Sequence, residues 1–415
     1  GPAASGAWME EFGSHYFDLA RKWDGTFGHQ GPPQAQPDSY DNWDATGAYL
    51  LAYAAPYKNL YILGRGGRVP PQLSKEKAME IVRMGRGWSP DDRESAYDRF
   101  SDQQLLQLLG SWSPTVRHRA AYALERRRAK VAPQLIQLLQ RGTIEQRRGA
   151  ALAIGRLGNH HAGSAFNTLL QALDHRDLWL RVKAAEALAR MGDRRQRAFP
   201  YLMAIIIRGP SRNDPRGMEQ RFISQTLFGN ILRNSIEGVD IDQLRVAMMK
   251  ALQNEDGRAR SSVGRVYKHL TFEQIKPLLP AIVEAIVEPA PSGIMFAAGI
   301  RLDGVEALAD HRIAEGMPLA LHALDVDTWG MGNRIPRVVE ILRKYGPAAR
   351  EILPQLRRLE QHLTNHQRAS ALSEGAQLVR DLVREIEASN PDNAPQLRRL
   401  NLPDLVKNLK VIDEK

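Results

Sequence analysis

The 415-residue sequence contains no cysteine. Disulfide bonds, cysteine nucleophiles and thiolate metal sites are therefore excluded, although the compartment is not fixed, because secreted proteins can also lack cysteine. The sequence also has no long apolar run. The best one, residues 201–207, is far shorter than the roughly 20 residues that span a bilayer. We therefore predict no membrane span.

Catalytic motifs are missing as well. The sequence has no Gly-x-Ser-x-Gly, no Walker loop and no His-Glu-x-x-His. Paired carboxylates and paired histidines occur, but sequence proximity alone builds neither a glycosidase site nor a metal site. We predict no catalytic residue, no metal ligand and no cofactor. A binding protein is therefore favoured over an enzyme, without excluding one.

The composition is that of a globular protein, with 43% hydrophobic and 25% charged residues. The chain begins with Gly1-Pro2, a pair typical of the scar of a cleaved tag. We therefore expect the native N-terminus to precede this sequence.

The charge is distributed unevenly along the sequence. The net charge is +10, from 57 Lys and Arg against 47 Asp and Glu. Residues 111–220 hold 20 of the basic side chains and only 8 of the acidic ones. Nearly all of this excess is arginine, which binds phosphate and carboxylate groups bidentately. The tract therefore predicts attraction to an acidic partner, unless it is only a solvated helical surface.

An internal repeat predicts the architecture. Three segments align without gaps at Arg117, Arg147 and Arg181, and each has small or apolar residues three, four, six and seven positions later. This spacing marks one face of a helix, and alanine at these positions lets a neighbouring helix approach closely. An apolar helix precedes each copy, and the later two copies end at Gly158 and Gly192, as helix ends often do. The repeating unit is therefore predicted to be a helical hairpin.

Weaker copies extend the repeat. They begin at Arg221, Arg260 and Arg301, and a last one is centred on Val338. The pattern resembles HEAT repeats, and the best match to the family motif lies at residues 177–188. The resemblance implies an all-α fold, a HEAT-like α-solenoid of about seven helical-hairpin repeats in which each repeat contacts only its neighbours.

The resemblance also implies a role for the repeat arginines. In HEAT units this arginine commonly contacts an Asp of an adjacent unit, so Arg117, Arg147 and Arg181 are expected to be structural. The arginines in excess of the motif are the candidates for ligand binding. They are Arg119, Arg126, Arg127, Arg128, Arg148, Arg194, Arg195 and Arg197.

The first 70 residues differ from the rest, being rich in aromatic residues, glycine and proline. Two blocks, residues 16–28 and 43–54, each contain a tryptophan, Trp23 and Trp43, close to acidic residues. Aromatic residues at helical spacing either pack in a core or form a stacking surface for a sugar or base. Trp23 and Trp43 are therefore candidate ligand-binding residues.

A helix followed by an Asp-Gly-Thr-Phe turn, as at residues 24–27, resembles one hairpin of the α/α-toroids of terpenoid-cyclase type. On this resemblance, residues 8–64 are the last one or two hairpins of a toroid, whose other helices would lie in a missing N-terminal domain. That domain is then one expected partner of the chain. The combination resembles an uncharacterised bacterial family that joins a toroid-like domain to HEAT repeats. The compartment stays open, with the periplasm and secretion among the options.

These observations predict five segments: an aromatic-rich hairpin segment at 1–70, a linker at 71–100, HEAT-like repeats at 101–345, capping helices at 346–390 and a tail at 391–415. The predicted function is a non-enzymatic scaffold that binds an acidic macromolecule, whether protein, nucleic acid or anionic glycan, on a concave, arginine-rich face. One alternative is an enzyme acting on a polyanion or glycan between the N-terminal hairpins and the first repeats. Another is a HEAT-fold DNA glycosylase, which would hold duplex DNA on a basic face.

Overall fold

The structure is a computed structural model, and it describes residues 74, 76, 96–111, 114–212, 214–288, 290–292, 296–324 and 334–400. The chain divides into two compact units, Gly1–Leu157 and Gly158–Lys415, which we call unit 1 and unit 2. The predicted hairpin segment at 1–70, with Trp23 and Trp43, lies outside the described residues.

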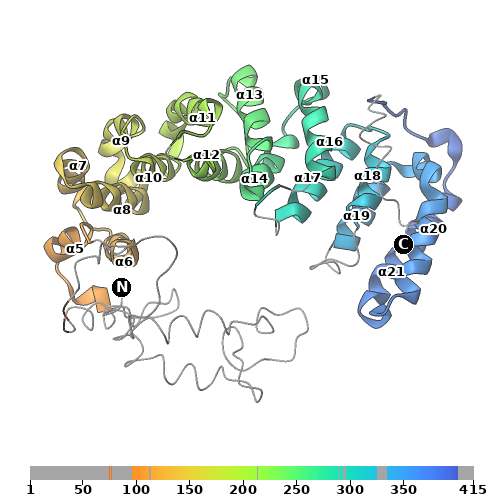
Figure 1. The fold of residues 1–415 in the computed structure, drawn as a ribbon, viewed down its shortest axis with the longest axis horizontal. Coiled ribbons are helices and arrows are strands. Elements are labelled where there is room, and N and C mark those ends of the chain that lie inside the picture. The colour runs from red at the N-terminus through yellow and green to blue at the C-terminus, as the bar shows by residue number, and fades with distance from the viewer. Residues whose placement is uncertain are drawn as a thin grey trace, which may run out of the picture. The chain divides into compact units, whose positions relative to one another are not determined.

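The described part of unit 1 consists of helices joined by short turns. Its elements are η4 (Ala96–Arg99), α5 (Asp102–Leu108), α6 (Pro114–Arg126), α7 (Ala132–Arg141) and α8 (Ile144–Ala162), the last of which crosses into unit 2 (Figure 1). Within α8, Gly158 has a left-handed φ of 67°, which coincides with the unit boundary. The glycine is needed there because a side chain would strain this backbone conformation.

Unit 2 continues with the same kind of helical hairpin. Its elements are η5 (Gly163–Ala165), α9 (Phe166–Ala172), α10 (Leu178–Leu188), η6 (Gly192–Ala198), α11 (Phe199–Arg208), α12 (Met218–Ser224), the π-helix η7 (Gln225–Ile231), α13 (Ile241–Leu252), α14 (Gly257–Tyr267), α15 (Phe272–Ile275), η8 (Lys276–Leu278), α16 (Leu279–Val287), α17 (Ala297–Asp310), α18 (Gly316–His322), α19 (Arg334–Arg343), η10 (Gly346–Ile352), α20 (Leu353–Asn365), α21 (Ala369–Ala388) and η11 (Pro391–Asn393).

The hairpins of unit 2 stack in two layers (Figure 1). In one layer α11 packs on α13, α13 on α16 and α16 on α18, while in the other α10, α12, α14, α17, α19 and α21 pack in succession. The described residues form no strand, only isolated β-bridges. This arrangement, in which helices contact their neighbours in chain order, confirms the predicted all-α, solenoid-like fold.

The predicted helix faces are the buried ones. The small and apolar residues that follow each repeat arginine are exposed by 1% or less. Alanine dominates these positions, and its small side chain permits close packing between helices. The residues are Ala120, Ala121, Ala123 and Leu124, then Ala150, Ala151, Ala153 and Ile154, then Ala184, Ala185, Ala187 and Leu188.

Local sequence signals also mark the helix ends. The Asp177 side chain caps α10 by accepting a hydrogen bond of 2.8 Å from the Leu180 amide. Gly192, which follows α10, has a left-handed φ of 57°. Pro133 lies in the first turn of α7, where its missing N–H has no partner to lose.

The C-terminal repeats end in the long hairpin of α20 and α21, whose apolar faces are buried against each other. Beyond η11, residues 394–400 form no helix and return to the turn between α17 and α18. No helix within the described ranges has both the length and the apolar character needed to cross a bilayer.

Candidate binding surface

Most of the repeat arginines stabilise the turns of the hairpins. Arg221 pairs with Asp256, and Arg301 donates to the Ile286 carbonyl within α16, but the other four each donate to a backbone carbonyl in the turn that precedes their own helix. Because turn carbonyls have no intrahelical partner, this bond stabilises the connection between the two helices. The bonds run from Arg117 to Ser111, from Arg147 Nε to Gly142 (3.0 Å), from Arg181 Nη1 to His175 (2.6 Å) and from Arg260 Nε to Asn254 (2.7 Å).

Arg181 also connects two repeats. Its guanidinium forms a forked contact with Glu219 of α12, with Nη2 2.7 Å from Oε2. Glu219 is only 2% exposed and also contacts Arg208 at 3.3 Å. The hydrogen bond with Glu219 raises the pKa of Arg181 although burial opposes this. Arg181 therefore has the structural role that the HEAT resemblance implies, with a glutamate as its partner.

Among the predicted ligand-binding arginines, Arg127 faces the backbone. Its Nη1 donates to the carbonyl of Phe100 at 2.6 Å, and its Nη2 donates to the carbonyls of Tyr97 and Asp98 at 3.0 and 2.7 Å. These carbonyls belong to η4 and the turn after it. Arg127, which directly follows α6, therefore connects η4 to the end of that helix. This geometry leaves its guanidinium little capacity for a ligand.

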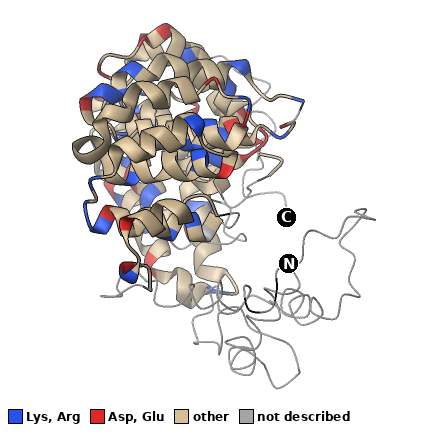
Figure 2. Ribbon diagram, turned by 90° about the vertical axis from the view of Figure 1, so that its left-hand side faces the viewer, with Lys and Arg blue, Asp and Glu red and all other residues tan. Residues whose placement is uncertain are grey.

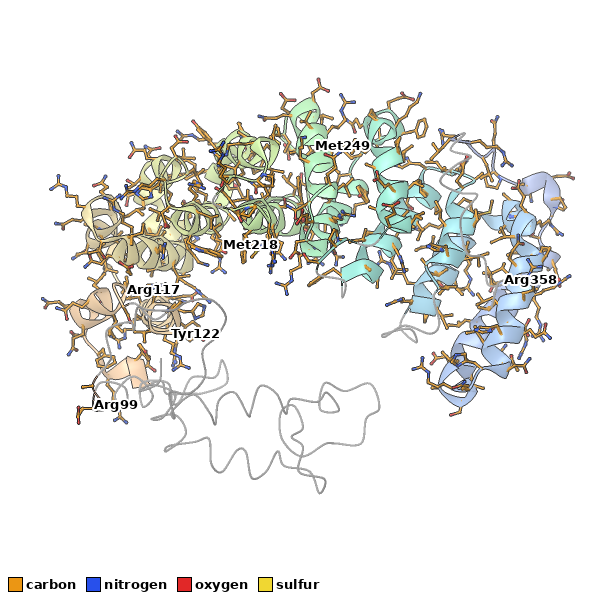
Figure 3. All side chains as sticks on the ribbon, viewed as in Figure 1. Arg99, Arg117, Tyr122, Met218, Met249 and Arg358 are labelled. Atoms are coloured by element: carbon orange, nitrogen blue, oxygen red, sulfur yellow. The ribbon has the colours of Figure 1, made fainter. Side chains whose placement is uncertain are left out.

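Arg126 lies in an aromatic stack with a residue of α8. Its guanidinium is 5.9 Å from the ring centre of Tyr122, and the guanidinium of Arg156 is 5.7 Å from the same ring. Arg126 pairs with Asp98 at 3.2 Å, and Arg156 pairs with Glu125 at 3.2 Å. Figure 3 labels Tyr122. The sequence did not mark this ring as a candidate, because a lone tyrosine in a helix carries no distinguishing signal.

Arg119 and Arg148 are half-buried beside other groups of unit 1. Burial raises the pKa of Tyr97, and the positive charge of Arg119 opposes the increase. Arg148 lies near Arg117, whose pKa is lowered by burial and then by the positive charge of Arg148. Two guanidinium groups close together favour the approach of an anion.

The turn between α6 and α7 presents cations to solvent. Arg128 and Lys130 are exposed there, next to Arg126, and the backbone of Arg128 has a left-handed φ of 50°. We call Arg126, Arg128 and Lys130 the basic turn. Residues 114–157 contain ten Lys and Arg against two Asp and Glu, and Figure 2 shows the charged residues along the ribbons. The basic turn is thus part of a strongly positive segment.

The other predicted arginines lie in unit 2, within η6. Arg194 donates to the Gly163 carbonyl at 2.9 Å, and the Arg197 guanidinium is 5.0 Å from the ring centre of Phe166. Arg195 is exposed. The predicted set is therefore divided between the two units, five in unit 1 and three in unit 2.

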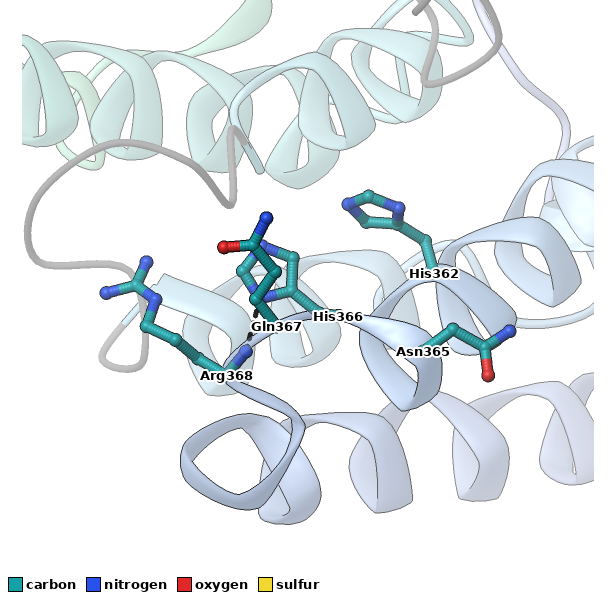
Figure 4. A pocket seen from close by; sticks show the side chains of 5 residues that line it. All are labelled: His362, Asn365, His366, Gln367 and Arg368. Carbon is teal, nitrogen blue, oxygen red and sulfur yellow. Dashed lines mark hydrogen bonds between the residues drawn. The ribbon is translucent and has the colours of Figure 1, made fainter.

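A cavity of about 540 Å³ lies at the turn between α20 and α21 (Figure 4). It is lined by His362, Asn365, His366, Gln367 and Arg368. The His366 ring accepts a hydrogen bond from the Arg368 amide through Nδ1, so its other nitrogen carries a proton when the ring is neutral. That tautomer does not suit metal binding, and the described residues contain no cluster of three or more potential metal ligands.

Two family models match parts of the chain. Residues 132–213 match a model described as HEAT repeats, and residues 1–64 match one described as a domain of unknown function, DUF6288. No curated protein matches the chain at a significant level. The first match and the helical hairpins confirm a HEAT-like helical repeat. HEAT repeats are generally protein-binding scaffold elements. The toroid resemblance of the N-terminal segment stays a prediction.

Proposed function

We propose that the chain is a non-enzymatic docking module that binds an acidic segment of a partner protein through the arginine-rich surface of unit 1. The observation that carries the proposal is the basic turn, where Arg128 and Lys130 are exposed within a segment of ten basic and two acidic residues. Such a surface attracts carboxylates and raises the rate of encounter with an acidic partner.

The stack of Arg126, Tyr122 and Arg156 supports the same proposal. Because a guanidinium over an aromatic ring is held in place, it loses less conformational freedom when it binds a carboxylate. Arg126 and Arg156 each keep an acidic neighbour, Asp98 and Glu125, which a stronger anionic ligand would displace. Arg127 is left out of the proposed surface, because its donors face the backbone of η4.

The test measures binding of a fluorescein-labelled acidic peptide, a 20-residue polyglutamate, by fluorescence anisotropy at low and physiological salt. We expect charge reversal of the basic turn, R126E/R128E/K130E, to weaken binding about tenfold or more, and we expect added salt to weaken wild-type binding. Heparin and duplex DNA serve as parallel probes. Tighter retention of either one than of polyglutamate would contradict a protein partner.

The matched control moves the same number of charges elsewhere. R233E/K250E/K276E reverses three exposed cations of unit 2 and changes the net charge equally. We expect this variant to bind the peptide within about twofold of wild type, because these cations belong to unit 2 and are not part of the proposed surface. If both variants lost the same affinity for the peptide, the effect would come from net charge alone, and a binding surface in unit 1 would be contradicted.

A further inference from the structure

The C-terminal segment forms backbone contacts with a turn far away in the sequence. Arg398 and Ile313 form a parallel β-bridge, in which the Arg398 amide donates to the Arg312 carbonyl at 2.8 Å and the Ala314 amide donates to the Arg398 carbonyl at 2.9 Å. The turn between α17 and α18 presents these groups because Arg312 has a left-handed φ of 54°. A stack of repeats in contact only with their neighbours needs no such bridge.

The side chain of Arg398 lies in a site made by two elements. Its guanidinium is 4.3 Å from the ring centre of Phe272 in α15, and its Nη1 donates to the His311 carbonyl at 2.8 Å, across 87 positions of sequence. The ring and the carbonyl together suit a guanidinium group. Its flat face can stack on the ring while an N–H at its edge donates a hydrogen bond to the carbonyl.

The next two residues of the segment, Arg399 and Leu400, each contact a glutamate. Arg399 pairs with Glu351 of η10 at 3.2 Å, and the Leu400 amide donates to Glu315 Oε1 at 2.7 Å. The second oxygen of Glu315, Oε2, is buried and has no hydrogen-bond partner among the described residues. An aromatic ring, two carboxylates and the backbone of a turn thus contact three successive residues, Arg398 to Leu400.

We propose that this edge, formed by Phe272, residues 311–315 and Glu351, is a binding site for an extended peptide with two adjacent arginines. In this structure residues 398–400 of the same chain occupy it. Main-chain pairing with an extended segment supplies affinity in such sites, and the side-chain contacts supply specificity. The ligand is basic and the site is acidic, so this inference does not depend on the proposed function of unit 1.

The tether to α21 makes the chain's own segment a strong competitor. A short tether gives an effective concentration on the order of millimolar, so a free peptide binds the wild-type site only weakly. The exposed position of Arg398 and Arg399 allows the segment to leave the site without unfolding a repeat. Substitution of these two arginines should therefore make the site available to a peptide added in trans.

The experiment uses the full chain with the substitutions R398A/R399A and a labelled peptide with the sequence of residues 394–400. We expect the variant to bind this peptide at least tenfold more tightly than wild type does. A peptide in which lysine replaces Arg398 should bind the variant several-fold more weakly, because lysine cannot stack and donate in the same plane. Equal affinity of wild type and variant, or no binding to either, would overturn the proposal.

A second measurement covers the case in which the double variant does not fold. Hydrogen exchange of the wild-type chain should show the amides of Ala314 and Arg398 exchanging faster than the core amides of α17, through local release of the segment. Exchange of these amides only through global unfolding would make the segment an obligatory part of the core. That result, or a double variant without helical structure, would equally refute a peptide-binding site.

Discussion

Arginine occupies two kinds of position in this protein. The repeat arginines and Arg127 donate to backbone carbonyls, whereas Arg128 and Lys130 are exposed to solvent. The first group stabilises turns that would otherwise leave carbonyls without partners. The donors of the first group face the backbone, so the arginine content overstates the size of the binding surface.

The contrast between two adjacent arginines gives a prediction. R127Q removes the bonds to the carbonyls of Tyr97, Asp98 and Phe100, and we expect it to lower the free energy of unfolding by about 2 kcal/mol. R128Q, at the next position, should change it by less than about 0.5 kcal/mol because the side chain is exposed. Urea denaturation followed by circular dichroism measures both. Similar values for the two variants would contradict the assigned role of Arg127.

At the scale of elements, the second helices of the hairpins depend on small residues where they cross. A side chain at Gly264 of α14 would place its Cβ 2.5 Å from the Cβ of Asp303 in α17. Gly229, in the π-helix η7, has only an ordinary contact of 3.8 Å with Ser262. The two glycines therefore separate a packing requirement from a general effect of glycine in helices.

We expect G264A to lower the free energy of unfolding by about 1–3 kcal/mol, because α14 and α17 must move apart. G229A should be neutral or stabilising by about 0.5 kcal/mol, since alanine restricts the unfolded chain and favours a helix. Thermal or urea unfolding of both variants is the measurement. A neutral G264A would show that this crossing tolerates a larger separation.

At the scale of the whole molecule, contacts between neighbouring repeats contribute to stability. Glu219 is buried between Arg181 and Arg208, so E219Q leaves buried positive charge without its counter-ion. We expect a loss of about 3 kcal/mol, concentrated in α10–α12, because repeat proteins open locally. E186Q removes a half-buried partner of Lys183 and should cost less than about 1 kcal/mol.

Hydrogen exchange with mass spectrometry locates the effect of E219Q. Amides of α10, α11 and α12 should exchange faster, while those of α20 and α21 should keep their wild-type rates. A uniform increase along unit 2 would show that this unit unfolds as a single cooperative body. The control E186Q should leave the exchange pattern of both regions unchanged.

The spacing of small and apolar residues after Arg117, Arg147 and Arg181 was sufficient to predict the helices, their buried faces and their glycine ends. These features depend on neighbours within about two turns of helix, and the periodicity of the chain records them directly. The candidate surface was predicted less well. Tyr122 was not singled out, and the predicted arginines turned out to be divided between two units.

By itself, the sequence determined an all-α repeat protein with a strongly basic tract, because helical period and charge are properties of short segments. Only the tertiary structure decided which cations are exposed. Arg127 meets carbonyls 27–30 positions away, and Arg398 meets a turn 87 positions away. These contacts form only because the helices stack in a particular way. A local sequence pattern does not show which residues far apart in the chain come close together in space.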